Sequence, residues 1–90
     1  MEEQVKITGV YRHFSGNYYF VENVGFDSES KERLVIYKPL YHRDDEKLIF
    51  VTPEAKFLED LESSTEGNLT GQSKRFVLCE KIAKNYLEKN

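Results

Sequence analysis

The 90-residue sequence has no tryptophan, one cysteine and two prolines. A single cysteine excludes an internal disulfide and fits a reducing compartment. The sequence also lacks any run of about 18 apolar residues, which a membrane helix would need. Its first residues are acidic and lack the apolar stretch of a signal peptide, so we expect a cytoplasmic protein outside the membrane.

A basic excess is absent too, since 13 Lys and Arg stand against 16 Asp and Glu, for a net charge of −3. Proteins that bind nucleic acid normally carry a basic excess, so nucleic acid is disfavoured as a partner. Aromatic residues are plentiful, with six Tyr and six Phe. A chain of this length makes one domain, residues 1–90, and we expect these rings to form much of its core.

Alternating apolar and β-branched residues between turn residues predict five short strands. Ser15-Gly16-Asn17 predicts the first turn, because Gly16 accepts a positive φ without a Cβ clash. The predicted strands cover residues 9–14, 18–26, 32–38, 47–52 and 74–78.

The second predicted strand, residues 18–26, is the longest. Gly25 near its end predicts a bulge or a sharp bend. Strict alternation would place two sets of side chains on opposite faces: Tyr18, Phe20, Glu22 and Val24 on one, and Tyr19, Val21 and Asn23 on the other.

Thr52-Pro53 predicts the start of a short helix over residues 53–61, since a hydroxyl cap precedes a proline at the first helical position. Apolar residues at helical spacing predict a second, C-terminal helix over residues 80–90. Together these elements predict a mainly β fold, a small five-stranded SH3-like barrel with a short helix and a C-terminal helix. An open five-stranded α+β sheet is the alternative.

The stretch Tyr11-Arg12-His13-Phe14-Ser15-Gly16-Asn17-Tyr18-Tyr19 contains Tyr-Arg-His, an aromatic residue, a spacer, Gly-Asn and nearby tyrosines. With this pattern the chain resembles the bacterial and phage family catalogued as domain of unknown function 1653, whose members open in the same way. Further pieces follow in the family's order: Asp27-Ser28-Glu29, residues 32–41, Phe50-Val51-Thr52-Pro53 and Phe57-Leu58. The resemblance covers residues 9–78 and implies a small β-rich fold. It implies no activity, because the family is uncharacterised.

The sequence departs from the family pattern at several positions. Thr52 replaces the usual arginine, Phe50 the usual tryptophan, and Phe26-Asp27 the usual Arg-His pair. If the family's arginines contact an anion, this chain retains Arg12 and has lost others. The segment from residue 80 onward lies outside the family pattern.

One group of residues has the chemistry of an anion site. A guanidinium offers a planar fork to phosphate or carboxylate, and tyrosine rings can stack on a base. The predicted ligand-binding residues are Tyr11, Arg12, His13, Asn17, Tyr18, Tyr37 and Tyr41. A structural interpretation stays open, in which Arg12 pairs with a surface carboxylate, His13 packs over the turn and the tyrosines fill the core.

Other candidate sites are weaker. His42 lies beside the acidic residues 44–46, but these lack the spacing of a calcium loop and are better interpreted as solvated. Cys79 has no neighbouring histidine and is expected to be a buried small residue. No P-loop, dinucleotide, zinc or nucleophile-elbow pattern occurs, so we expect no catalytic site, metal or cofactor.

The leading hypothesis is a non-catalytic domain that binds a small anionic or nucleotide-like molecule, with sequestration of that molecule as one use of the binding. The alternative is an interaction module on an SH3-like barrel, with Lys74-Arg75 and an edge strand as its contact surface. The net charge then favours a protein over nucleic acid. A homo-oligomer is compatible with both, because 90 residues rarely enclose a deep pocket alone. An enzyme is the third hypothesis and lacks a recognisable base–nucleophile pair.

Overall fold

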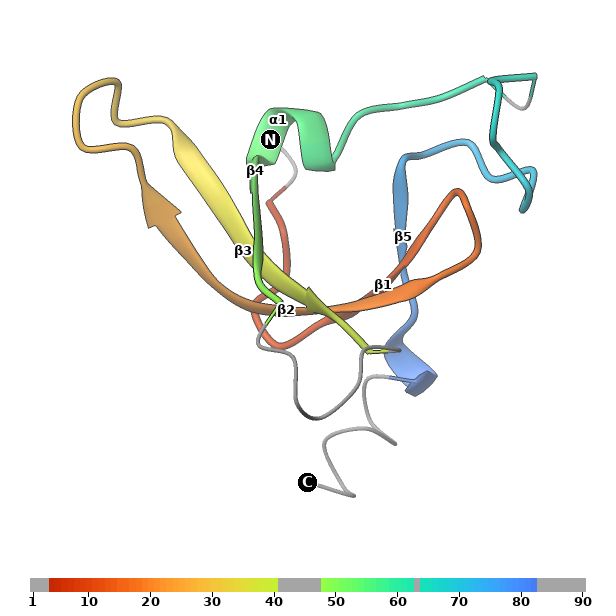
Figure 1. Ribbon diagram of the computed structural model, residues 1–90, viewed down its shortest axis with the longest axis horizontal. Coiled ribbons are helices and arrows are strands. Elements are labelled where there is room, and N and C mark those ends of the chain that lie inside the picture. Colours follow the sequence, from red (N-terminus) through yellow and green to blue (C-terminus); the bar gives the residue numbers. More distant parts are fainter. Residues whose placement is uncertain (1–3, 41–47, 63, 83–90) are drawn as a thin grey trace.

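The structure, a computed structural model, describes residues 4–40, 48–62 and 64–82. Its strands form one five-stranded sheet in the order β4-β3-β2-β1-β5 (Figure 1), and all neighbouring strands are antiparallel. The elements are β1 Val10–His13, β2 Tyr18–Phe26, β3 Arg33–Pro39, β4 Phe50–Pro53, α1 Glu54–Phe57 and β5 Phe76–Leu78. The prediction of a mainly β fold with five antiparallel strands is therefore confirmed.

The two edges of the sheet are β4 and β5, and among the described residues no strand pairing joins them. The sheet is thus open, and closure into an SH3-like barrel is not confirmed. In Figure 1, α1 and the segment that follows it extend from the β4 side to the β5 side of the sheet. Asp60 and Lys74 form an isolated bridge within this segment. The chain that leads into β5 therefore pairs with the segment that follows α1.

A bulge in β2 changes which side chains face the core. The register with β3 shifts between Val21 and Asn23, so one extra residue is accommodated there. Val24 consequently packs against the same core cluster as Val21, and the predicted strict alternation is wrong beyond this point. The bulge was expected at Gly25, which instead pairs regularly with Leu34.

The helix is shorter than predicted. Its N-cap is Pro53, and the hydroxyl of Thr52 lies 2.8 Å from the Tyr37 hydroxyl rather than capping the helix. The helix ends at Phe57, and the N–H of Leu58 still donates to the carbonyl of Glu54. At the C-terminus residues 80–82 are helical, and the rest of the predicted second helix lies outside the described residues.

The main core cluster lies between one face of the sheet and α1. Phe57 is fully buried and stacks on Phe76, with ring centroids 3.9 Å apart and planes 5° from parallel. Tyr11 meets Phe57 edge-on at 5.1 Å. The buried members are Val5, Tyr11, Val21, Val35, Tyr37, Phe57 and Phe76. Aromatic rings therefore dominate the face of the sheet on which the candidate site lies.

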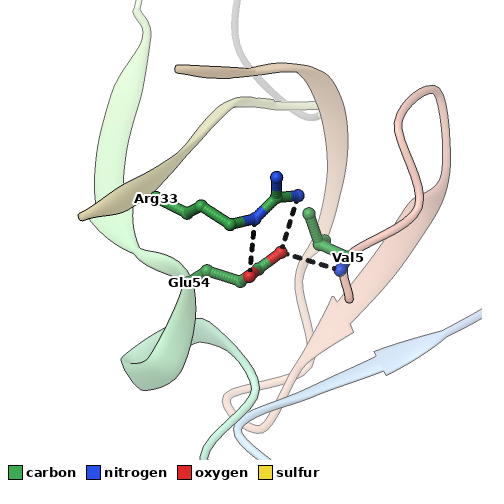
Figure 2. A network of polar contacts seen from close by, with 3 residues as sticks. All are labelled: Val5, Arg33 and Glu54. Atoms are coloured by element: carbon green, nitrogen blue, oxygen red, sulfur yellow. Dashed lines mark hydrogen bonds and ion pairs between the residues drawn. The ribbon is translucent and has the colours of Figure 1, made fainter. Parts of the chain in front are cut away.

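Glu54 connects α1 to β3 and to the N-terminal segment (Figure 2). Its carboxylate accepts hydrogen bonds from Arg33 Nε at 2.9 Å, from Arg33 Nη2 at 3.2 Å and from the Val5 N–H at 3.0 Å. Desolvation by burial raises the pKa of Glu54, but the bonds from Arg33 and Val5 outweigh it and leave this pKa below its usual value. The network holds Val5 in the core and orients the first turn of α1.

Candidate functional site

A small cavity opens on the core face of the sheet, above the buried aromatic rings. Its volume is about 200 Å³. Side chains from all five strands, from α1 and from the residue before β5 line it: His13, Tyr19, Tyr37, Phe50, Thr52, Lys56, Arg75 and Phe76. We call it the aromatic cavity.

Strand register brings these rings together. Tyr37 lies directly opposite Phe50 in the β3–β4 pair, and His13 lies opposite Phe76 in the β1–β5 pair. Side chains opposite each other in an antiparallel pair share one face. Tyr19 is in edge-to-face contact with Tyr37, Phe76 and Phe50, at centroid distances of 5.5, 5.8 and 6.2 Å. The rings form an apolar floor.

Arg75 supplies positive charge at this cavity. Backbone hydrogen bonds fix the residue, since its N–H donates to the Glu59 carbonyl and its own carbonyl accepts from the Phe14 N–H. Its guanidinium carbon lies 5.5 Å from the centre of the Phe14 ring. The side chain is only 23% exposed, and among the described residues it forms one ion pair, a 3.4 Å contact between Nη2 and Glu59. A guanidinium carries five N–H donors, and within the described residues only a donor of Nη2 has a side-chain partner, Glu59.

The Nε atom of Arg75 is buried and has no hydrogen-bond partner among the residues that the structure describes. Buried polar atoms are almost always paired, so an exception in a cavity wall calls for an explanation. An anion bound to the guanidinium would compensate its charge in this partly desolvated position.

Lys56 adds a second cation from the exposed side of α1. Within the ranges that the structure describes it makes no ion pair. The described residues that line the cavity include no carboxylate and no carboxamide. The local charge is therefore positive in a protein whose net charge is −3.

His13 lines the cavity as a neutral ring. The Ser15 N–H donates to its Nδ1 at 3.1 Å, which assigns the ring proton to Nε2. Burial lowers the pKa of His13, and the charge of nearby Arg75 lowers it further. His13 thus contributes a donor that needs no positive charge.

The His13 Nδ1 atom also lies 2.7 Å from Ser15 Oγ, a separation at which a base can activate a nucleophile. However, the same nitrogen is bonded to the backbone of Ser15, as in a local turn. No carboxylate contacts His13 in the described part of the chain, and Ser15 does not line the aromatic cavity. This contact closes the turn before β2 and does not form a triad.

The structure divides the residues predicted to bind a ligand between the two faces of the sheet. His13 and Tyr37 lie in the aromatic cavity. Tyr11 is buried below it, and its hydroxyl accepts from the Lys6 N–H at 2.9 Å. Arg12 is exposed on the opposite face, where its guanidinium carbon lies 5.6 Å from the centre of the Tyr18 ring.

The remaining predicted residues also lie away from the aromatic cavity. Asn17 and Tyr18 line a second, more apolar cavity of about 320 Å³ with Gly16, Leu40 and Ile82. No charged side chain is among these described lining residues. Tyr41 and the acidic loop with His42 lie outside the described residues.

Comparison with known proteins identifies the family. The family described as "Protein of unknown function (DUF1653)" matches residues 9–77. The chain belongs to this family. A crystal structure of a DUF1653 protein from Bordetella bronchiseptica is similar, with 27% sequence identity and a TM-score of 0.60 over 77% of this chain and 81% of that one. No curated protein matches the chain.

This DUF1653 member has functional candidates that the sequence alone did not single out. Lys56 and Arg75 enter the cavity from elements 19 positions apart in the sequence. The sequence signal for Arg75 is the basic pair Lys74-Arg75, which by itself indicates an interaction surface. Among the described residues, no group of three or more potential metal ligands occurs, and no helix has the length and apolarity to span a membrane.

Proposed function

We propose that this DUF1653 domain is a non-catalytic binding protein for a small anionic or nucleotide-like molecule, which it holds in the aromatic cavity. The observation that carries this proposal comes from the described residues: one Arg75 donor has a side-chain partner, Lys56 makes no ion pair, and both lie above an aromatic floor. Cavities that bind small molecules are typically apolar, with a few converging polar groups.

Two cations in an apolar setting suit an anion. Arg75 is largely screened from water, so its attraction for a negative group is stronger than that of a surface arginine. Lys56 stands at the exposed side, where it can attract the ligand and pair with it. In this proposal the anion meets Arg75 rather than Arg12, which the fold directs to the other face.

The test is thermal stabilisation by a panel of small anions that includes nucleoside mono- and diphosphates, cyclic nucleotides and carboxylates. We expect at least one anion to raise the melting temperature of the wild type. Arg75→Gln should lower the affinity for that anion about tenfold or more. Arg12→Gln is the matched control, because it removes the same charge from the opposite face, and it should leave binding unchanged.

Two results would contradict the proposal. One is a wild-type protein that no anion stabilises and from which no small molecule is recovered by mass spectrometry after denaturation. The other is a loss of binding in Arg12→Gln with full binding in Arg75→Gln.

A protein-interaction module, built as an SH3-like barrel that is open between β4 and β5, is the second candidate. It is favoured by exposed apolar side chains at and before the edge strand β4: Leu48, Ile49 and Val51 are 39%, 56% and 56% exposed. An edge strand has unpaired backbone groups that another chain can use. Val51→Lys should then reduce association, including self-association, in sedimentation experiments while anion binding is retained. A wild type that sediments as a monomer and retains no protein partner would count against this candidate.

A further inference from the structure

The size of the aromatic cavity restricts what can occupy it. Its volume is about 200 Å³. Sites for drug-sized ligands typically measure about 300–1,000 Å³. A single ring with one small charged group suits the smaller volume, whereas a nucleotide, with its base, sugar and phosphate, would extend well outside it.

The arrangement of the rings is also unlike a slot for a nucleobase. A base held between two rings needs them nearly parallel and about 7 Å apart, twice a contact distance of ~3.5 Å. The rings of Tyr19, Tyr37, Phe50 and Phe76 contact one another at angles between 46° and 79°. They offer one surface for a ligand ring rather than two parallel walls.

The lining donates hydrogen bonds far better than it accepts them. Arg75 and Lys56 are donors only. The hydroxyls of Tyr37 and Thr52 already bond to each other at 2.8 Å. Because the described lining has no carboxylate or carboxamide, the amino and ring N–H groups of a nucleobase would find poor acceptors. A ring without N–H groups avoids this loss.

The charged groups around the aromatic cavity favour a ligand with a single negative charge. Arg75 and Lys56 contribute two positive charges, Glu59 beside Arg75 removes one, and His13 is neutral. A carboxylate neutralises the remainder. A phosphate monoester, which is nearly a dianion at neutral pH, would leave an excess negative charge against aromatic rings.

We propose that the ligand of the aromatic cavity is a single aromatic ring that carries one carboxylate and no ring N–H. The carboxylate pairs with Arg75 and is approached by Lys56, and the ring rests on Tyr19, Phe50 and Phe76. This inference rests on the proposed function and narrows its ligand class from anions in general to aromatic carboxylates.

Calorimetric titration of the full chain with benzoate tests the inference. Benzamide has the same shape without the charge, cyclohexanecarboxylate lacks the aromatic ring, and phenyl phosphate and adenosine monophosphate present a phosphate. We expect benzoate to bind most tightly of these probes, and benzamide to bind about tenfold more weakly or worse. Lys56→Gln should weaken benzoate binding without changing the melting temperature, and Lys6→Gln, which removes a lysine outside the cavity, should leave it intact.

The outcomes separate the inference from the proposed function. Tighter binding of phenyl phosphate or adenosine monophosphate would overturn the aromatic carboxylate and leave an anion site in place. Equal affinities for benzoate and benzamide, or for benzoate and cyclohexanecarboxylate, would overturn it as well. If none of the anions bound, both would fail. In an NMR titration with benzoate, amide chemical-shift changes confined to the second cavity around Tyr18 would refute binding in the aromatic cavity.

Discussion

Replacing Glu54 by Gln is expected to destabilise the domain by about 2 kcal/mol, because hydrogen bonds to charged groups contribute about 1.5–3 kcal/mol. The substitution keeps the shape of the side chain and one acceptor oxygen, but removes the charge that holds Arg33. Breaking a fully buried ion pair costs about 3–5 kcal/mol. Here the Glu54 side chain is 12% exposed and that of Arg33 is 33% exposed. Water can therefore hydrate the Arg33 guanidinium once its partner is removed, and the smaller destabilisation of about 2 kcal/mol applies.

The destabilisation should depend on pH in a defined direction. The pKa of Glu54 is lower in the folded protein than the ordinary glutamate value of 4.5. The contribution of the charged carboxylate is therefore fully present above this value and is lost as the pH falls through the folded-state pKa. The difference between wild type and Glu54→Gln should be constant near neutral pH and should shrink below about pH 4.5.

Urea and thermal denaturation, both followed by circular dichroism, measure the destabilisation and its dependence on pH. For a domain of this size a change of ~2 kcal/mol corresponds to a melting temperature lowered by roughly 8–16 °C. Glu22→Gln is the matched control, since the Glu22 side chain paired with Lys38 is 37% exposed, against 12% for Glu54, and pairs near the surface contribute about 0–1 kcal/mol. A Glu54→Gln variant as stable as the control, or a difference that persists undiminished at pH 3, which is roughly one unit below the usual glutamate pKa, would refute the reasoning.

Three further predictions concern the turn and the cavity. Gly16→Val should destabilise the fold by about 1–3 kcal/mol through backbone strain, because Gly16 has a φ of +109° and no atom lies within 4 Å of an added Cβ; an unchanged denaturation midpoint would argue against that conformation. NMR titration should find the pKa of His13 below 6.5, since burial and Arg75 both disfavour its charged form. Because the unfolded chain then binds the proton more readily, the contribution of His13 to stability should decrease as the pH falls below 6.5, and a folded-state pKa above that value would contradict this. Arg12→Ala should change the free energy of unfolding by no more than about 0.5 kcal/mol, as substitutions at exposed positions usually do. A larger loss would show that the stacking of Arg12 on Tyr18 stabilises the fold.

Features governed by neighbouring residues could be predicted from the sequence. The bounds of β2 agree with the predicted strand over residues 18–26, and Gly16 has the positive φ expected of the first turn. Both depend on steric preferences of the backbone and on the alternation of side chains, which act over a few residues. The family motif around Tyr11 to Tyr19 could likewise be identified before the fold was known.

Features that depend on pairing between distant segments could not be predicted. The bulge after Val21 exists only in the register of β2 against β3, and it places Val24 in the core. The helix stops after one turn, and the chain that follows it pairs through Asp60 with Lys74 near β5. No local pattern contains either constraint.

The candidate site likewise depends partly on features that the sequence determines and partly on contacts between distant segments. The sequence by itself determined which residue types were available, and it singled out His13 and Tyr37, which the fold brings to one cavity. Only the tertiary structure decided that Arg75 faces this cavity while Arg12 stacks on Tyr18 across the sheet. An arginine's chemistry is the same at both positions, but its burial and its partners are set by side chains from distant strands. These contacts decide which cation lies beside an apolar floor.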